Sequence, residues 1–108
     1  MEWTVETLNA RVDEEIAALP ADMRARLARI SALIATAGLE HVREPHVKHI
    51  EGRLWEIRLE GQDGISRALY VTAREKRVVI VRVFIKKTQK TPRTEIEIAL
   101  VRAKEVHE

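Results

Sequence analysis

The spacing of apolar side chains predicts one strand and two helices in the first third of the chain. Residues 3–8 alternate apolar and polar positions, as a half-buried β-strand does. Residues 9–19 and 21–37 instead carry apolar positions at helical spacing, joined by a short connection that favours an αα-hairpin. Asn9 can cap the first helix and Gly38 can end the second. The apolar positions of the two helices are Val12, Ile16, Leu19, Met23, Leu27, Ile30, Ile34 and Ala37.

The middle of the chain predicts an antiparallel sheet. The expected strands are residues 47–50, 55–59, 65–71 and 77–84. Turn signals at residues 61–64 and 74–76 join the last three strands as a meander. Residues 77–84 are apolar at almost every position, so both faces of that strand are expected to be covered, as in a central strand.

A last helix is expected from Thr94 to about Val106, with Thr91 as its cap and Pro92 in its first turn. The order of elements is therefore strand, two helices, three or four strands, and a helix. This order predicts an α+β fold, in which an N-terminal strand and αα-hairpin precede an antiparallel β-meander and a C-terminal helix. We expect the helices to cover one face of the sheet, and residues 1–108 to form one domain.

Composition and charge narrow the possible functions. The chain has no cysteine, which excludes disulfides, thiol catalysis and cysteine-bound metal. It shows neither an apolar run of membrane-spanning length nor a signal segment, so we expect a cytoplasmic protein without a membrane partner. Residues 1–47 carry a net charge of −3, residues 48–93 a net charge of +7, and residues 94–108 a net charge of −2. The predicted sheet holds the positive excess, although solvated lysines and arginines are also common on the strands of small proteins.

The stretch between the last strand and the last helix carries only positive charge. It reads Phe84-Ile85-Lys86-Lys87-Thr88-Gln89-Lys90-Thr91-Pro92-Arg93. Several cationic side chains at the C-terminal end of a buried strand form a compact cationic site. Such a site suits a polyanion, and RNA is the first candidate.

Four blocks of residues form a recognisable pattern: Leu54-Trp55-Glu56-Ile57-Arg58, Arg67-Ala68-Leu69-Tyr70, the block from Phe84 to Pro92, and Glu95-Ile96-Glu97-Ile98-Ala99. This pattern resembles the RelE/ParE toxin superfamily, and most closely its HigB-like, phage-derived branch. The resemblance covers essentially the whole chain and implies a RelE/ParE-like fold similar to small microbial ribonucleases. It implies a type II toxin that cuts mRNA on the ribosome and is neutralised by a cognate antitoxin in a heteromeric complex, often one of helix-turn-helix type.

The sequence departs from this family pattern in two places. Arg82 and Val83 stand where HigB-like relatives often have histidine and glycine, and the C-terminal tyrosine of the RelE branch has no counterpart. The alternatives are therefore a ParE-like inhibitor of DNA gyrase and a catalytically inactive relative that only binds its antitoxin.

RNA cleavage without a metal requires a base for the 2′-hydroxyl, cations for the phosphorane and an acid for the leaving oxygen. The resemblance makes Arg58 a candidate to stabilise the phosphate, and Arg67 and Lys86 complete the expected cationic set. Either could instead have a structural role, Arg67 for example in an ion pair with Glu56 or Glu60. His49 and Lys48 are the competing candidates for acid or base, and His49 is also readable as an ordinary loop histidine.

Five further cations are expected to contact the RNA backbone. They are Arg53, Arg82, Lys87, Lys90 and Arg93. Arg82 interrupts an apolar strand, so it either pairs internally or enters the site. We expect no cofactor and no metal, because the H-x-x-H pair His46 and His49 has no third ligand nearby. Tyr70 is expected to pack, and both tryptophans are expected to fill the core.

Overall fold

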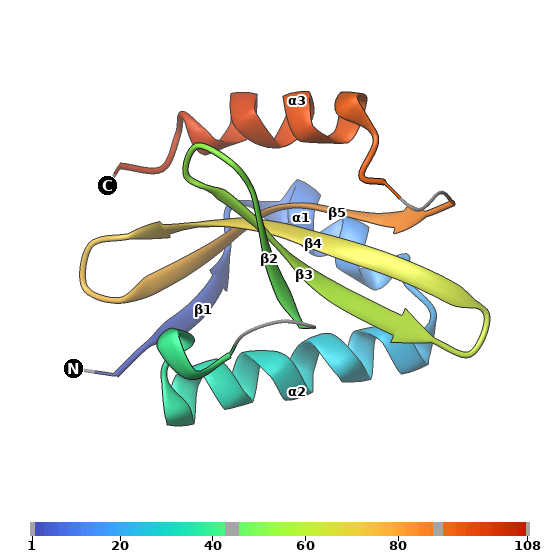
Figure 1. Cartoon of the computed structure of the whole chain (residues 1–108), viewed down its shortest axis with the longest axis horizontal. Coiled ribbons are helices and arrows are strands. Elements are labelled where there is room, and N and C mark those ends of the chain that lie inside the picture. Colours follow the sequence, from blue (N-terminus) through green and yellow to red (C-terminus); the bar gives the residue numbers. More distant parts are fainter. Residues whose placement is uncertain (1, 43–45, 88–89, 108) are drawn as a thin grey trace.

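A five-stranded sheet in the order β1-β5-β4-β3-β2 forms the centre of the computed structural model, which describes residues 2–42, 46–87 and 90–107 (Figure 1). The strands are β1 (Thr4–Thr7), β2 (Val47–Glu51), β3 (Leu54–Gly61), β4 (Gly64–Ala73) and β5 (Arg77–Lys86). β1 pairs parallel with β5, and the other neighbours pair antiparallel. The predicted meander is therefore confirmed, and the N-terminal strand extends it beyond β5.

Three α-helices flank this sheet, and they cover both of its faces (Figure 1). They are α1 (Ala10–Ala17), α2 (Ala21–Ala37) and α3 (Arg93–Ala103), with a short 3₁₀ turn, η1 (Leu39–His41), after α2. The Asn9 side chain caps α1 by accepting the Val12 N–H at 3.2 Å, and Gly38 ends α2 at φ +93°. Among the described residues, no helix has the length and apolar character needed to cross a membrane.

Two separate cores correct the expectation that the helices cover one face. On one face, α1 and α2 pack on Ile57, Leu59, Ala68, Tyr70, Val78, Ile80 and Val83. On the other face, α3 packs through Ala99 and Ala103 on Leu54, Leu69, Val71, Val79 and Val81. Strands β4 and β5 are apolar on both faces because each face has its own helical layer.

A β-bulge at Val81 changes which way the second half of β5 faces. Tyr70 pairs with Ile80 while the preceding residue, Leu69, pairs with Arg82, so Val81 is the extra residue. Val78 and Ile80 consequently face α1 and α2, whereas Arg82 joins the face of α3. In a regular strand, the spacing of two residues between Val78, Ile80 and Arg82 would put all three on one face. The bulge instead places Arg82 on the other face.

The second half of β5 has no strand beside it on the β1 side, because β1 pairs only with Arg77 to Ile80. Side chains satisfy its backbone instead. The Glu15 carboxylate accepts the Val83 N–H at 3.0 Å, and Arg102 donates to the Val81 carbonyl at 2.9 Å. These contacts cover an edge whose backbone groups would otherwise be open to another strand.

Candidate functional site

A cluster of three cations surrounds one buried carboxylate on the face of the sheet that carries α3. We call Arg58, Arg67, Lys86 and Glu56 the cationic cluster. The sheet register assembles it, because Arg58 lies opposite Arg67 across β3 and β4 while Lys86 lies opposite Ile65 across β4 and β5. Glu56 is only 2% exposed. Its carboxylate oxygens lie 3.5 Å from Nε of Arg67 and 4.0 Å from Nε of Arg58.

The charges of these four residues do not balance among themselves, since three cations surround the one carboxylate of Glu56. The pKa of Lys86 is lowered from its ordinary value by burial and then by the charge of Arg67, with smaller effects of the same sign from Arg58 and Lys48. Burial likewise lowers the pKa of Arg67, although that guanidinium stays charged. Like charges held together at a largely buried position are unfavourable unless an anion joins them.

Two donors in the cluster are left without a hydrogen bond among the described residues, although both lie within 4.0 Å of the Glu56 carboxylate. The Nε atoms of Arg58 and Arg67 are buried and have no hydrogen-bond partner in the described part of the chain. An unsatisfied buried donor costs about 1–3 kcal/mol, and more when it is charged. A phosphate oxygen could satisfy guanidinium donors with charge-assisted bonds.

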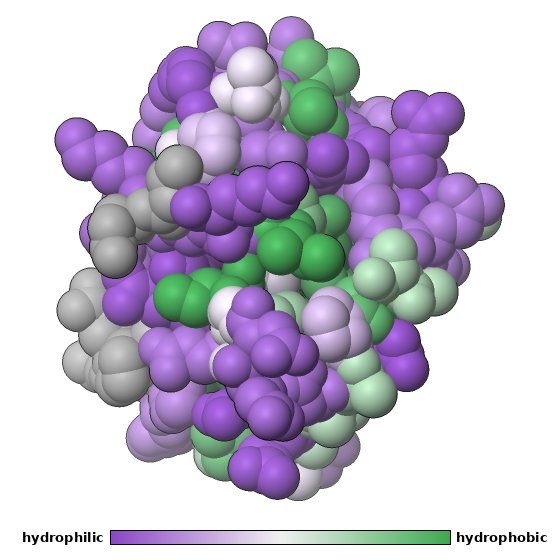
Figure 2. Space-filling view, turned by 90° about the vertical axis from the view of Figure 1, so that its right-hand side faces the viewer, coloured by the Kyte–Doolittle hydropathy of each residue, from purple (hydrophilic) through white to green (hydrophobic). Residues whose placement is uncertain are grey.

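The segment before α3 is tied to this cluster. The Thr91 hydroxyl donates to Glu56 Oε2 at 2.7 Å, while Pro92 is the N-cap residue and makes no side-chain capping bond. The expectation that Thr91 caps α3 is thus wrong, because Glu56 takes its hydroxyl. Thr88 and Gln89, which belong to the resemblance, lie outside the described residues. Figure 2 shows the end of the molecule with the β3–β4 turn, where hydrophilic side chains surround a smaller hydrophobic area.

The two candidates for the base lie on different faces of the sheet. Lys48 pairs with Glu56 across β2 and β3, and so belongs to the face of the cationic cluster. His49 pairs with Trp55 and lies on the opposite face, where the centroids of the His49 and Trp55 rings are 4.9 Å apart. The structure therefore brings Lys48 to the cluster and places His49 away from it.

Trp55 corrects a further expectation, because its side chain is 39% exposed and does not fill the core. Tyr70 is buried as predicted, and desolvation raises the pKa of its hydroxyl above the ordinary value. Trp3 is partly buried, and its indole N–H donates to Glu40 at 3.1 Å.

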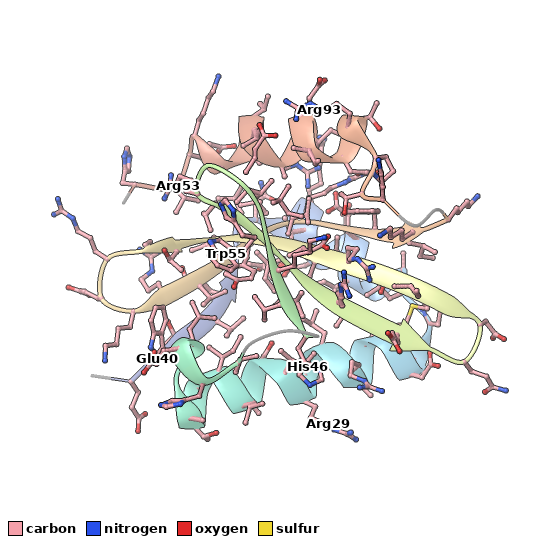
Figure 3. The ribbon with its side chains drawn as sticks, in the orientation of Figure 1. Arg29, Glu40, His46, Arg53, Trp55 and Arg93 are labelled. Atoms are coloured by element: carbon pink, nitrogen blue, oxygen red, sulfur yellow. The ribbon has the colours of Figure 1, made fainter. Side chains whose placement is uncertain are left out.

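The five cations expected to contact RNA are spread over the molecule. Arg82 pairs internally with Glu95 at 2.6 Å and Glu15 at 2.7 Å, which settles the alternative left open for it. Arg93 pairs with Glu51 at 2.6 Å. Arg53 donates to backbone carbonyls of Thr72, Ala103 and Val106, and lies beside the end of α3 in Figure 3. Lys87 and Lys90 are exposed and follow Lys86, the cluster residue at which β5 ends.

The sequence left open an ion pair of Arg67 with Glu56 or Glu60, and the structure shows Glu56 as the partner, although nothing in the sequence indicated that Glu56 would be buried. A glutamate that alternates with apolar residues on a strand looks solvated, and only the pairing of β3 with β4 shows that Arg67 faces it. Within residues 2–42, 46–87 and 90–107, no three histidine, aspartate or glutamate side chains lie close enough together to hold a metal ion.

The fold agrees with what comparisons with known proteins find. Over residues 14–104 the chain matches the family described as Phage derived protein Gp49-like (DUF891), and it belongs to that family. Its structure is similar to the crystal structure of the archaeal RelE-RelB complex from Pyrococcus horikoshii OT3, with a TM-score of 0.58 and 20% sequence identity over 79% of this chain and 96% of that chain. No curated protein matches the chain. The family and the RelE-like fold support the resemblance to the RelE/ParE superfamily.

Proposed function

We propose that this chain is the toxin of a type II toxin–antitoxin pair and that it cuts mRNA on the ribosome. The observation that carries the proposal is the cationic cluster, in which Arg58 and Arg67 keep buried donors unsatisfied beside Lys86. Arg58, whose side chain is 35% exposed, gives a phosphate chain access to this otherwise buried cluster. The proposed partners are mRNA and a cognate antitoxin of helix-turn-helix type, in the cytoplasm.

Each residue of the cluster has a role in the proposed reaction. Arg58 and Arg67 bind the scissile phosphate and stabilise the charge that grows on it in the transition state. Lys86 accepts the proton of the 2′-hydroxyl, since its lowered pKa increases the neutral fraction near neutral pH. Lys48 is the second candidate for proton transfer, and Glu56 holds the two arginines in place. These groups supply charge stabilisation without a metal ion.

Variants of the two arginines test this assignment. Arg58→Ala and Arg67→Met should each slow cleavage by about 10²–10³, the usual effect of removing one preorganised donor. Cleavage is measured by primer extension on a reporter mRNA after induction of each variant, and folding by thermal melting of the purified protein. Arg29→Ala is the matched control, because Arg29 is an exposed arginine on α2, far from the cluster (Figure 3).

Cuts within translated codons that disappear in both cluster variants but not in the control support the proposal. Two folded variants that cut as the wild type does would remove Arg58 and Arg67 from the site. Growth arrest with a DNA-damage response and without cuts would instead favour a ParE-like action on gyrase.

A further inference from the structure

A cavity of 670 Å³ lies on the face of the sheet opposite the cationic cluster. Trp3, Trp55, Tyr70 and His49 line it, together with Glu40 and Lys48. It thus holds three of the four aromatic side chains of the chain, including both tryptophans. Cavities of about 300–1,000 Å³ are typical of sites for small organic ligands.

The sheet register builds the aromatic wall of this cavity. His49 lies opposite Trp55, and Trp55 lies opposite Tyr70, so one row of rings crosses β2, β3 and β4. The His49 and Trp55 rings meet edge to face at an angle of 60°. An indole that stays 39% exposed beside such a row leaves an apolar surface for a flat ligand.

Polar groups in the cavity offer hydrogen-bond acceptors. The carbonyl of Gly52 lies 2.7 Å from Nε2 of His49 and can only accept, so Nε2 carries the proton and Nδ1 of the neutral ring is an acceptor. The Glu40 carboxylate accepts from the Trp3 indole, and hydrogen bonds hold its pKa below the ordinary value, so it is an anion at neutral pH. Figure 3 shows Trp55 and Glu40 in the same part of the molecule, away from the β3–β4 turn.

Lys48 connects this cavity with the cationic cluster. It lies on the edge strand β2, lines the cavity, and lies opposite Glu56 of the cluster in the sheet register. A phosphate chain bound at the cluster can therefore pass Lys48 and turn around the edge of the sheet. The next group along such a chain is a base, which is flat and carries hydrogen-bond donors and acceptors on its edge.

We propose that the cavity binds one unpaired nucleobase of the RNA, stacked on Trp55 with its edge toward Glu40 and His49. This inference rests on the proposed function, because it takes RNA as the ligand of the neighbouring cluster. It adds a specificity site that selects bases with N–H donors for Glu40, across the sheet edge from the phosphate that the arginines hold.

Intrinsic tryptophan fluorescence tests this directly, because both tryptophans line the cavity. The probe is a single-stranded hexanucleotide with 2′-O-methyl groups, which blocks cleavage by removing the nucleophile. The wild-type protein is titrated with this probe and with versions that lack the base at one position in turn. Quenching should occur, and removal of one particular base should weaken binding about tenfold, as expected for one stacked base.

Variants of the cavity complete the experiment. Trp55→Leu should weaken binding of the full probe by the same factor and should abolish the difference between the full and the abasic probe. Val101→Ala is the matched control, since Val101 is an exposed apolar residue on α3 outside the cavity, and it should bind as the wild type does. Trp3 remains as the fluorescent reporter in Trp55→Leu.

Equal binding of every abasic probe, or unchanged RNA binding by folded Trp55→Leu, would overturn the inference. If Trp55→Leu loses a co-expressed antitoxin but keeps its RNA affinity, a protein side chain occupies the cavity and the inference is also wrong. The proposed function fails separately, when the arginine variants still cut mRNA or when the wild type makes no cuts, whatever the fluorescence shows.

Discussion

Lys86 is the residue whose surroundings most affect the proposed chemistry. Its neutral form is the base, and that form becomes more abundant as pH rises through its lowered pKa. The cleavage rate on programmed ribosomes should therefore increase from neutral to mildly alkaline pH. Lys86→Arg keeps the charge but cannot accept the proton, so it should cut about 10²–10⁴ times more slowly. If Lys86→Arg keeps both the rate and the pH profile, Lys86 acts only through its charge.

The same shift has a consequence for stability. The pKa of Lys86 is lower in the folded chain than in the unfolded one. At pH values between these two pKa values, the unfolded chain binds more protons than the folded chain does. The free energy of unfolding therefore rises with pH in this range. Below that range the charged amine opposes folding. Lys86→Met should thus stabilise the inactive protein at neutral pH, by on the order of 1 kcal/mol. Urea unfolding measures this, and a less stable variant would show that the lysine is compensated in the folded state.

Glu56 is expected to hold the arginines rather than to react. Glu56→Gln keeps an acceptor for Thr91 but removes the charge between Arg58 and Arg67, and should cost about 3 kcal/mol of stability. Added sulfate should restore more stability to this variant than to the wild type, as thermal melting would show. Glu60→Gln is the matched control, because Glu60 is exposed on the same strand and should change stability by less than about 0.5 kcal/mol.

The sequence predicted the cations of the cluster but not their arrangement. The resemblance and the charge pattern indicated Arg58, Arg67 and Lys86, and these do come together. The burial of Glu56 and the exposure of Trp55 could not be predicted, because both depend on which residues face each other across strands. A shift of one residue in pairing reverses the face of every side chain.

At the scale of elements, local patterns predicted the helices and strands well, and their packing less well. Apolar periodicity and the Asn9 cap located α1 and α2, because both signals are local. The second helical layer was missed because an α3 with few fully buried residues could have lain on either face. The bulge at Val81 was missed because it has no signature in the residues around it.

Glu15 joins several elements of the fold, and its removal has the clearest expected effect on stability. It accepts from Arg82, Arg102 and the Val83 N–H, and so joins α1, α3 and the open edge of β5. Glu15→Ala should destabilise the fold by about 2–3 kcal/mol, since two half-buried guanidinium groups each lose one of their acceptors and the Val83 N–H loses its side-chain acceptor. Hydrogen exchange should show faster exchange at Val83 in particular. Glu14→Ala is the control, because Glu14 is an exposed neighbour on α1. Equal stability of the two variants would mean that water or other side chains replace Glu15.

At the scale of the molecule, folding neutralises much of the charge asymmetry seen along the chain. Acidic side chains from the terminal segments pair with arginines of the basic segment, as Glu6 does with Arg77 and Glu95 does with Arg82. The positive surface is therefore smaller than the net charge of +7 for residues 48–93 suggests. Part of what remains is a local concentration of positive charge at the cationic cluster and the exposed Lys87 at the end of β5.

This concentration predicts how an antitoxin would bind. An acidic segment that covers the cluster should associate more slowly as salt rises, because exposed charges are screened beyond about 8 Å at physiological ionic strength. Stopped-flow association of the toxin with its antitoxin measures the effect for the wild type and for Lys86→Glu/Lys87→Glu. The double variant should associate at least about tenfold more slowly at low salt and should lose most of its salt dependence.

Arg24→Glu/Arg26→Glu on α2 is the control with the same change in net charge. If the control slows association as much as the double variant does, net charge alone steers binding. If the association rate does not depend on salt in the wild type or in either variant, the antitoxin docks away from the cluster, on the helical layer of α1 and α2.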